Sequence, residues 1–260
     1  RIVTIHQDIY GSGLDHSDTD GMILRTQLTP IFDEYDIDVV LQGHDHTYSR
    51  TKLLYGDGQT HGTYEFRLNE DGSDYDWDNA YNTQTDEQIP LYPEEGDTAG
   101  QAAHDAFQAD NNCYTIEDVE GNTVTNPQGI LYMTANSASG SKFYELISSQ
   151  QDYVAARSQN WLPSYSVINL TADTFSIDTY QITDDGTVEK IDDTFTIRKT
   201  AEVEETAAVT VDGEAAEVAT ANVGGQTYYR LRDLATAVNG TADQFNVEWQ
   251  YGVIVITGEA

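Results

Sequence analysis

The sequence predicts an α/β fold with a β-sandwich, followed by a small α+β domain. Three observations indicate this. A strand, a helix and a second strand follow one another within residues 1–41. Apolar and polar residues alternate in several stretches between residues 165 and 197, which is typical of antiparallel strands. The composition changes near Thr200, which indicates a domain boundary.

The N-terminal elements are predicted from apolar runs and helical periodicity. Arg1–Ile5 is a short buried-strand candidate that leads to His6. A helix is expected over Gly21–Tyr35, and Ile37–Leu41 is the next strand. This order predicts parallel strands joined by a right-handed crossover. His6 should therefore meet the residues after the second strand at one edge of the sheet.

The predicted helix contains a proline. Pro30 lacks a backbone donor, so we expect it to kink the helix or to start a second short helix capped by Thr29. The approximate apolar face consists of Met22, Leu24, Leu28, Ile31 and Phe32.

The octet Gly43–Arg50 reads Gly-His-Asp-His-Thr-Tyr-Ser-Arg and directly follows the second strand. Ligands of open α/β sheets bind at the carboxyl ends of strands, and glycine allows a sharp turn there. Two histidines one residue apart, His44 and His46, suit a metal centre because neutral imidazole is a common ligand of zinc- and iron-type ions. The octet is therefore the centre of the predicted site.

The middle of the chain is richer in polar residues. Thr51–Tyr55 and Thr63–Leu68 alternate as strands do. Residues 69–128 are predicted to form an acidic insertion, with a short helix over Gly100–Asp110. His104 has no visible partner in the sequence, and we assign it no chemical role.

Several further strands are predicted to complete a sandwich. Gly129–Thr134 is apolar and precedes a turn of small residues at 135–142. The alternating stretches are Tyr165–Leu170, Thr174–Tyr180 and Thr194–Ile197, with a hairpin turn at Thr183–Gly186.

The last part of the chain is predicted to fold separately. Residues 200–208 are rich in Ala, Glu and Thr and are interpreted as a linker. Within 209–260, Val209–Val211 is expected to precede a turn at Asp212–Gly213. A helix with an apolar face is expected around Leu231–Val238, ended by Asn239–Gly240. A closing hairpin is expected from Phe245–Trp249 and Val253–Ile256.

The chain is strongly acidic. It has 45 acidic and 12 basic residues, which gives a formal net charge of −33. Such a charge argues against nucleic acid or anionic membrane surfaces as broad partners. It suits a protein in an extracellular or cell-surface setting, although acidity can also serve solubility alone.

Other whole-chain features limit the compartment and the kinds of site. The single cysteine, Cys113, excludes an intrachain disulfide framework and a cysteine-based zinc site. The sequence has no apolar stretch of membrane-spanning length. The chain opens on Arg1 and enters a strand at once, so we expect its true N-terminus to lie upstream.

Two motifs together carry a family resemblance. Val3-Thr4-Ile5-His6, followed by Gly43-His44-Asp45-His46-Thr47-Tyr48-Ser49-Arg50, resembles the C-terminal half of a calcineurin-like metallophosphoesterase, closest to the purple acid phosphatases. The resemblance extends to about Lys199 and implies a metallophosphoesterase β-sandwich flanked by helices. It also implies a secreted bacterial hydrolase of phosphoric esters, either a phosphatase or a phosphodiesterase.

The resemblance implies roles for individual residues. His6 and His44 would bind one metal of a binuclear centre and His46 the other, with iron, zinc or manganese as the ions. A metal-bound hydroxide would attack the phosphorus atom. His16 resembles the histidine that donates a proton to the leaving group, while Arg50 is expected to have a structural role at the edge of the site.

The chain also departs from the family pattern. The expected Asp-x-His, Gly-Asp and Gly-Asn-His motifs do not follow Arg1, and the family places them upstream. The bridging aspartate is therefore expected outside these residues. We predict that the isolated 260 residues bind metal weakly and have no turnover.

The last unit, 209–260, resembles the small domain named for the N-terminal region of copper amine oxidases. The stretch Tyr229-Arg230-Leu231-Arg232-Asp233-Leu234-Ala235 carries the resemblance. This unit contains no histidine, cysteine or methionine, so copper binding is unsupported. We expect it to attach the protein to the cell surface or to act as a spacer.

Two other functions remain open. A non-catalytic bacterial surface or binding protein could keep a phosphoesterase scaffold, and upstream ligands would distinguish it from an enzyme. A mononuclear zinc protein with His6, His44 and His46 as its ligands ranks last, because it leaves the family resemblance without a reason. The sequence does not say whether the substrate is a monoester, a diester or a nucleotide.

Overall fold

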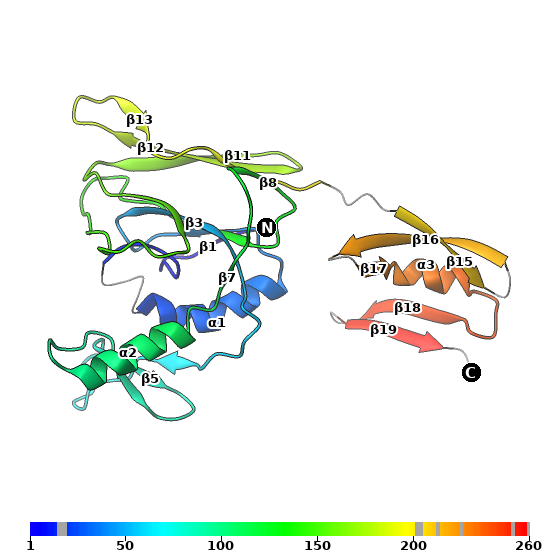
Figure 1. The fold of residues 1–260 in the computed structure, drawn as a ribbon, viewed down its shortest axis with the longest axis horizontal. Helices are drawn as coiled ribbons and strands as arrows, with labels where there is room; N and C mark the ends of the chain where they lie inside the picture. The colour runs from blue at the N-terminus through cyan, green and yellow to red at the C-terminus, as the bar shows by residue number, and fades with distance from the viewer. Residues whose placement is uncertain (15–19, 201–204, 212–213, 224–225, 251–252, 259–260) are drawn as a thin grey trace. The chain divides into compact units, whose positions relative to one another are not determined.

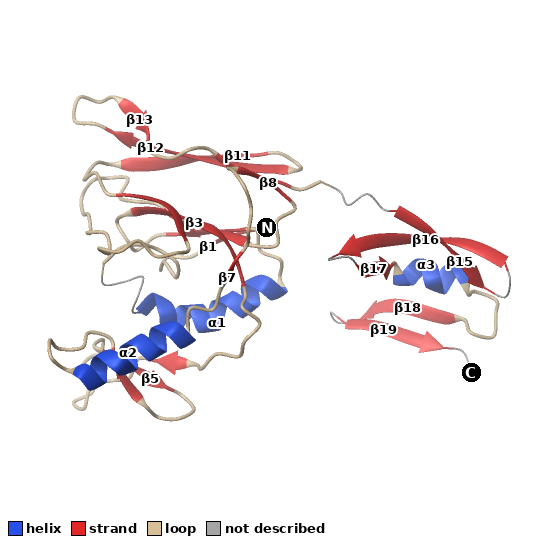
Figure 2. Ribbon diagram, in the orientation of Figure 1, coloured by secondary structure: helices blue, strands red, loops and turns tan. Residues whose placement is uncertain are grey.

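The structure is a computed structural model that describes residues 1–14, 20–200, 205–211, 214–223, 226–250 and 253–258. The chain divides into two compact units, Arg1–Lys199 and Thr200–Ala260. Strands predominate in both units, and the described residues contain three helices. Figures 1 and 2 show the helices and strands of each unit.

The first sheet of unit 1 carries the two histidine motifs. Its strand order is β1-β2-β9-β3-β10, with β7 paired to β3. Neighbours β1, β2 and β9 are parallel, whereas β3 runs antiparallel to β9, β10 and β7. The strands are β1 (Ile2–Thr4), β2 (Val39–Gln42), β3 (Tyr48–Tyr55), β7 (Thr115–Ile116), β9 (Ile130–Thr134) and β10 (Val154–Ser158).

The second sheet lies over one face of the first, as a sandwich requires (Figure 2). Its order is β11-β12-β14-β8, with β13 paired to β12. The strands are β8 (Thr123–Thr125), β11 (Ser164–Leu170), β12 (Thr174–Ile182), β13 (Val188–Lys190) and β14 (Phe195–Arg198). The core between the sheets includes Val39, Leu53, Leu131, Met133, Phe175, Ile177, Phe195 and Ile197.

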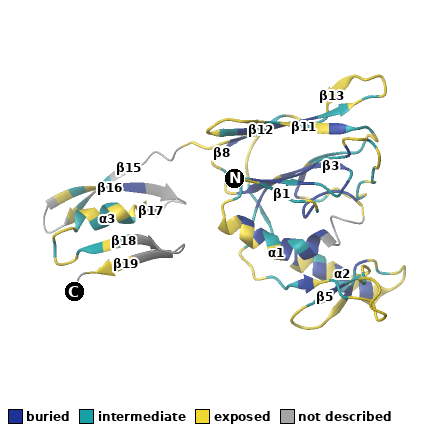
Figure 3. Cartoon of the chain, turned by 180° about the vertical axis from the view of Figure 1, so that it is seen from behind, coloured by how far each residue is buried: buried dark blue, intermediate teal, exposed yellow. Residues whose placement is uncertain are grey.

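The other face of the first sheet is covered by α1 (Asp20–Glu34). Val39 and Val40 of β2 are both completely buried, one on each face, because layers cover the sheet on both sides. This double burial explains why β2 reads as a continuous apolar run rather than an alternating one. Figure 3 shows that β3 of the same sheet is also largely buried.

Pro30 does not start a second helix, and that alternative prediction is wrong. Helix α1 runs through Pro30 to Glu34. The Thr29 hydroxyl donates to the Arg25 carbonyl at 2.9 Å within the same helix instead of capping a new one. Packing of α1 on the sheet therefore outweighs the missing proline donor.

The acidic stretch 69–128 contains regular secondary structure. Its strands β5 (Asn79–Asn82) and β6 (Gln88–Pro90) form a three-stranded sheet with β4 (Tyr64–Glu65), which precedes the stretch, and α2 (Thr98–Asp110) follows. Strand β4 is shorter than the predicted Thr63–Leu68. These elements share a small core with α1, made of Met22, Ile23, Tyr64, Ala80, Ile89, Leu91 and Phe107.

Unit 2 contains a three-stranded antiparallel sheet, a short helix and a hairpin. Strand β15 begins at Glu205, inside the stretch 200–208 predicted as a linker, so the linker prediction is too long. The predicted Asp212–Gly213 turn lies outside the described residues. The elements are β15 (Glu205–Val211), β16 (Glu214–Val223), β17 (Gln226–Tyr229), α3 (Leu231–Ala237), β18 (Phe245–Gln250) and β19 (Val253–Gly258).

Among the described residues, no helix combines the length and the apolar character needed to cross a membrane.

Candidate metal centre

His6 and His44 lie side by side at the ends of two neighbouring parallel strands. Strands β1 and β2 pair from Ile2↔Val39 to Thr4↔Leu41, and the Gly43 amide then donates to the His6 carbonyl at 3.0 Å. The two imidazole rings are 5.4 Å apart between centroids, at 72°. His6 is exposed and His44 is half-buried. The predicted convergence of these two histidines is what the structure shows.

The backbone conformation at Gly43–His44 restricts which residues can occupy these two positions. A Cβ on Gly43 would lie 3.2 Å from the His6 carbonyl oxygen, which is tighter than ordinary contact. His44 has a φ of +67°, in the left-handed region that non-glycine residues adopt rarely and at a cost of about 1–3 kcal/mol. This conformation turns the chain immediately after the strand and brings the His44 ring against His6.

The loop that follows His6 is held by side chains from the second motif. Gln42 Oε1 accepts from the Ile9 amide at 2.8 Å, and Asp45 Oδ2 accepts from the Gly13 amide at 2.8 Å. Both side chains are buried. Asp45 is the middle residue of His-x-His, and its place here is structural. No sequence pattern predicted a role for Gln42, Asp45 or Gly13.

His46 is oriented by a different segment. Its Nδ1 lies 2.8 Å from the Lys142 carbonyl oxygen. A carbonyl only accepts, so Nδ1 carries the proton and Nε2 keeps its lone pair for a metal. A backbone carbonyl on one imidazole nitrogen is a common outer-shell arrangement in metal sites. The His46 ring also lies 5.1 Å from the Tyr144 ring, at 49°.

Gln159 ties these segments together from a third position in the chain. Its Nε2 donates to the His46 carbonyl at 2.7 Å and to the Tyr144 carbonyl at 2.6 Å. The small-residue turn 135–142 thus leads to a segment that touches the site. No sequence signal identified Gln159, because its partners lie far away in the chain.

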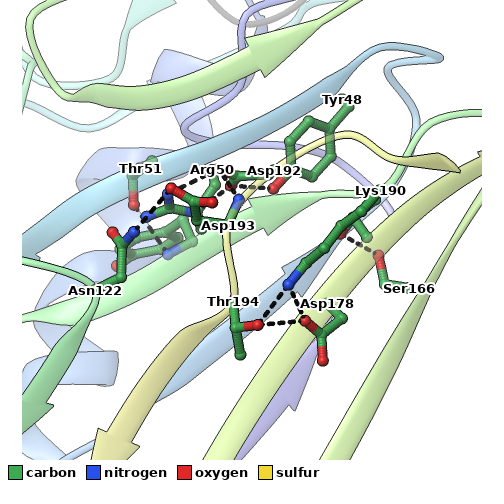
Figure 4. Close-up of polar contacts among 12 residues, drawn as sticks. Tyr48, Arg50, Thr51, Asn122, Ser166, Asp178, Lys190, Asp192, Asp193 and Thr194 are labelled. Carbon is green, nitrogen blue, oxygen red and sulfur yellow. Dashed lines mark hydrogen bonds and ion pairs between the residues drawn. The ribbon is translucent and has the colours of Figure 1, made fainter.

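Arg50 belongs to a buried polar network (Figure 4). Its guanidinium contacts both carboxylate oxygens of Asp192, at 2.6 and 3.2 Å, and the Tyr48 hydroxyl donates to the same carboxylate at 2.7 Å. Burial alone would raise the pKa of Asp192, but these hydrogen bonds outweigh burial and hold it below its usual value. Burial and the Asp192 charge raise the pKa of Tyr48. The arrangement matches the structural role expected for Arg50.

The described residues do not form a complete metal site. No group of three or more His, Cys, Asp or Glu side chains in the described part of the chain is placed to hold an ion. His6 and His44 lie together, whereas His46 contacts the Lys142 carbonyl and Gln159. A mononuclear site on all three histidines is therefore not what the described residues show. His16 lies outside the described residues.

A cavity of about 480 Å³ lies at the opposite edge of the first sheet. Asp38, just before β2, contributes to its lining together with Asp33, Gly56 and Lys199. The ligands of α/β sheets bind at the carboxyl ends of parallel strands rather than at this edge. We therefore place the site at the histidines and not at this cavity.

Comparisons with known proteins do not assign the chain to a family. No family model matches the sequence, and no curated protein matches it. Among solved structures, a purple acid phosphatase from yellow lupin (Lupinus luteus) seeds is similar with a TM-score of 0.40 and 11% identity. The match covers 76% of this chain and 24% of the lupin chain. A TM-score of 0.40 does not establish a shared fold, so the function has to be inferred from the residues of the site.

None of these findings bears on the resemblance of residues 209–260 to the copper amine oxidase N-terminal region, which stays a prediction.

Proposed function

We propose that this protein is a metal-dependent phosphoric-ester hydrolase. The observation that carries the proposal is the pair of imidazoles, His6 and His44, packed 5.4 Å apart at adjacent parallel strand ends. His46 has its Nδ1 bonded to a backbone carbonyl, which leaves its Nε2 lone pair to ligate a metal. Such a donor set suits zinc, iron or manganese.

The residues of this chain have separable tasks in the proposal. His6 and His44 would hold one ion and His46 the other, with further ligands completing each shell. When bound, such ions polarise the phosphoryl group and supply a nucleophile at neutral pH. His16 would donate a proton to the leaving group. Gln42 and Asp45 fix the loop after His6, and Lys142 and Gln159 fix His46.

The test uses the protein expressed from its full reading frame with zinc, iron or manganese in the medium. We expect bound metal and hydrolysis of 4-nitrophenyl phosphate. His44→Asn and His6→Asn should lower metal content and reduce activity by about 100-fold or more, because even outer-shell partners of metal ligands cost 10- to 100-fold.

His61→Asn is the matched control. His61 contacts Asp57 and the Asp110 carbonyl, outside the candidate centre, so its replacement should leave metal content unchanged. Equal metal content and activity in wild type and His44→Asn would refute the assignment of His44 as a ligand.

A second candidate is a non-catalytic bacterial surface or binding protein. The net charge of −33 and the appended unit, with Tyr228 and Tyr229 exposed by 54% and 47%, favour this alternative. We propose a secreted or cell-surface location in either case, with attachment through residues 209–260. A full-length protein that takes up no metal and hydrolyses no ester would favour the binding protein.

A further inference from the structure

Two aromatic residues, Phe143 and Trp161, lie close in the sequence to Lys142 and Gln159, the residues that contact His46. Phe143 follows Lys142, whose carbonyl holds the His46 imidazole. Its ring lies 6.1 Å from the Trp161 ring, at 76°. Trp161 is 54% exposed and Phe143 is half-buried. We call this pair the aromatic wall.

The backbone of Trp161 is unusual for so large a residue. Its φ is +58°, in the left-handed region where a bulky side chain is a genuine outlier. The Trp161 amide donates to Gln159 Oε1 at 3.2 Å, while Gln159 Nε2 donates to the His46 carbonyl. One glutamine therefore sets both the His46 backbone and the Trp161 backbone.

Folding stability does not account for this tryptophan. Glycine or asparagine would adopt the same φ at a lower cost, and an indole that is 54% exposed recovers only part of its burial energy. Strained residues that persist next to a site are candidates for a functional role.

A positive charge accompanies the aromatic wall. The Lys142 ammonium lies 4.6 Å from the centre of the Tyr144 ring, and that ring is 5.1 Å from His46. In a chain with a net charge of −33, a lysine at this place offers local attraction for a phosphoryl group. The residue next to Phe143 in the chain thus carries a cation close to Tyr144.

We infer that Trp161, held edge-to-face by Phe143, determines substrate specificity by stacking on a planar aromatic group of the phosphoric ester, either an aryl group or a nucleobase. The inference rests on the proposed hydrolase function. Aromatic side chains bind planar rings by stacking, and the neighbouring Lys142 orients the anionic end of the same molecule toward the histidines.

Activity measurements on the full-length protein test this inference. Three substrates separate the sources of the ring: 4-nitrophenyl phosphate, adenosine 5′-monophosphate and glycerol 2-phosphate, which has no ring. Trp161→Ala should lower kcat/KM about 10-fold for an aromatic ester, mainly through KM, with a change below about twofold for glycerol 2-phosphate. Trp161→Phe should restore most of the loss. The aromatic ester that responds identifies the ring.

Trp77→Ala is the matched control, because Trp77 is also 54% exposed but lies in the acidic stretch 69–128. This replacement should leave kcat/KM unchanged for all three substrates. An equal loss on all substrates in Trp161→Ala, or no loss on any, would overturn the inference while leaving the hydrolase intact.

A binding measurement separates failure of the wall from failure of the hydrolase. Phenylphosphonate should bind the wild type at least about fivefold more tightly than methylphosphonate, and Trp161→Ala should remove the difference. Equal binding of the two phosphonates in the wild type overturns the inference even if esters are hydrolysed. Absence of both hydrolysis and bound metal would defeat the proposed function. The phosphonate comparison would still test whether Trp161 binds an aromatic ring.

Discussion

At the scale of single residues, the backbone of Gly43 and His44 is the most restricted part of the candidate site. His44 adopts a left-handed φ, and Gly43 approaches the His6 carbonyl so closely that a Cβ would sit 3.2 Å from it. His6 and His44 meet because the backbone between strand and loop turns within these two residues. Small changes here should therefore affect the metal ligands more than the fold.

Gly43→Ala tests this. The added methyl should push the His6 backbone by a few tenths of an ångström, so we expect metal affinity to fall by about 10-fold with a stability loss near 1 kcal/mol. Metal titration and thermal unfolding of the full-length protein measure the two effects. Gly258→Ala is a suitable control because a Cβ there meets nothing within 4 Å. Unchanged metal affinity in Gly43→Ala would contradict the claim.

At the scale of elements, the site depends on strand β3 being fixed to the second sheet. Arg50 and Tyr48 of β3 both bind Asp192, which precedes β14 (Figure 4). The Arg50 guanidinium also lies over the Phe195 ring at 5.0 Å. Because β3 begins two residues after His46, this network anchors the strand that follows the site.

Asp192→Asn should destabilise the fold by about 3 kcal/mol, because it leaves the Arg50 charge buried without its counter-charge. The pKa of Asp192 is lowered by folding, so its contribution is present above the unfolded pKa of about 4 and is lost as pH falls through the folded value.

Thermal unfolding from pH 7 to pH 2 checks both statements. The difference between the wild type and Asp192→Asn should shrink below about pH 4. Asp193→Asn is the control, since the Asp193 carboxylate accepts from Asn122 at 3.5 Å and the substitution keeps the Asp193 amide, which donates to Asp192 at 2.8 Å. A stability difference that does not change with pH would show that the carboxylate charge is not the cause.

At the scale of the whole molecule, the proposed metal ligands and the aromatic wall all lie in unit 1. Unit 2, Thr200–Ala260, has its own sheet, helix and hairpin. Helix α3 has no buried residue. We propose attachment rather than catalysis as the role of this unit.

Removal of residues 200–260 from the full-length protein should therefore leave kcat/KM for 4-nitrophenyl phosphate within about twofold of the wild type, because separate domains act independently by default. Retention of the protein at the cell surface should fall if this unit is the attachment. A loss of activity larger than tenfold, with normal metal content, would place unit 2 in the catalytic function.

Several features followed from local patterns in the sequence. The β1-α1-β2 order, the helix at 98–110 and the antiparallel strands from 164 onward are all encoded in periodicity and turn residues, which act over a few positions. The same logic placed His6 and His44 together, because parallel neighbours end at one edge of a sheet.

Other features depend on which distant segments meet. Strand β8, from the acidic stretch, pairs with β14, and Gln159 reaches His46, yet nothing in either local sequence specifies these partners. The left-handed conformations of His44 and Trp161 are likewise imposed by tertiary contacts against local preference. Sequence patterns were sufficient to predict the sheet edge that His6 and His44 share. The orientation of the two rings and their surroundings could not be predicted from local patterns, because long-range hydrogen bonds and packing form only when the chain folds.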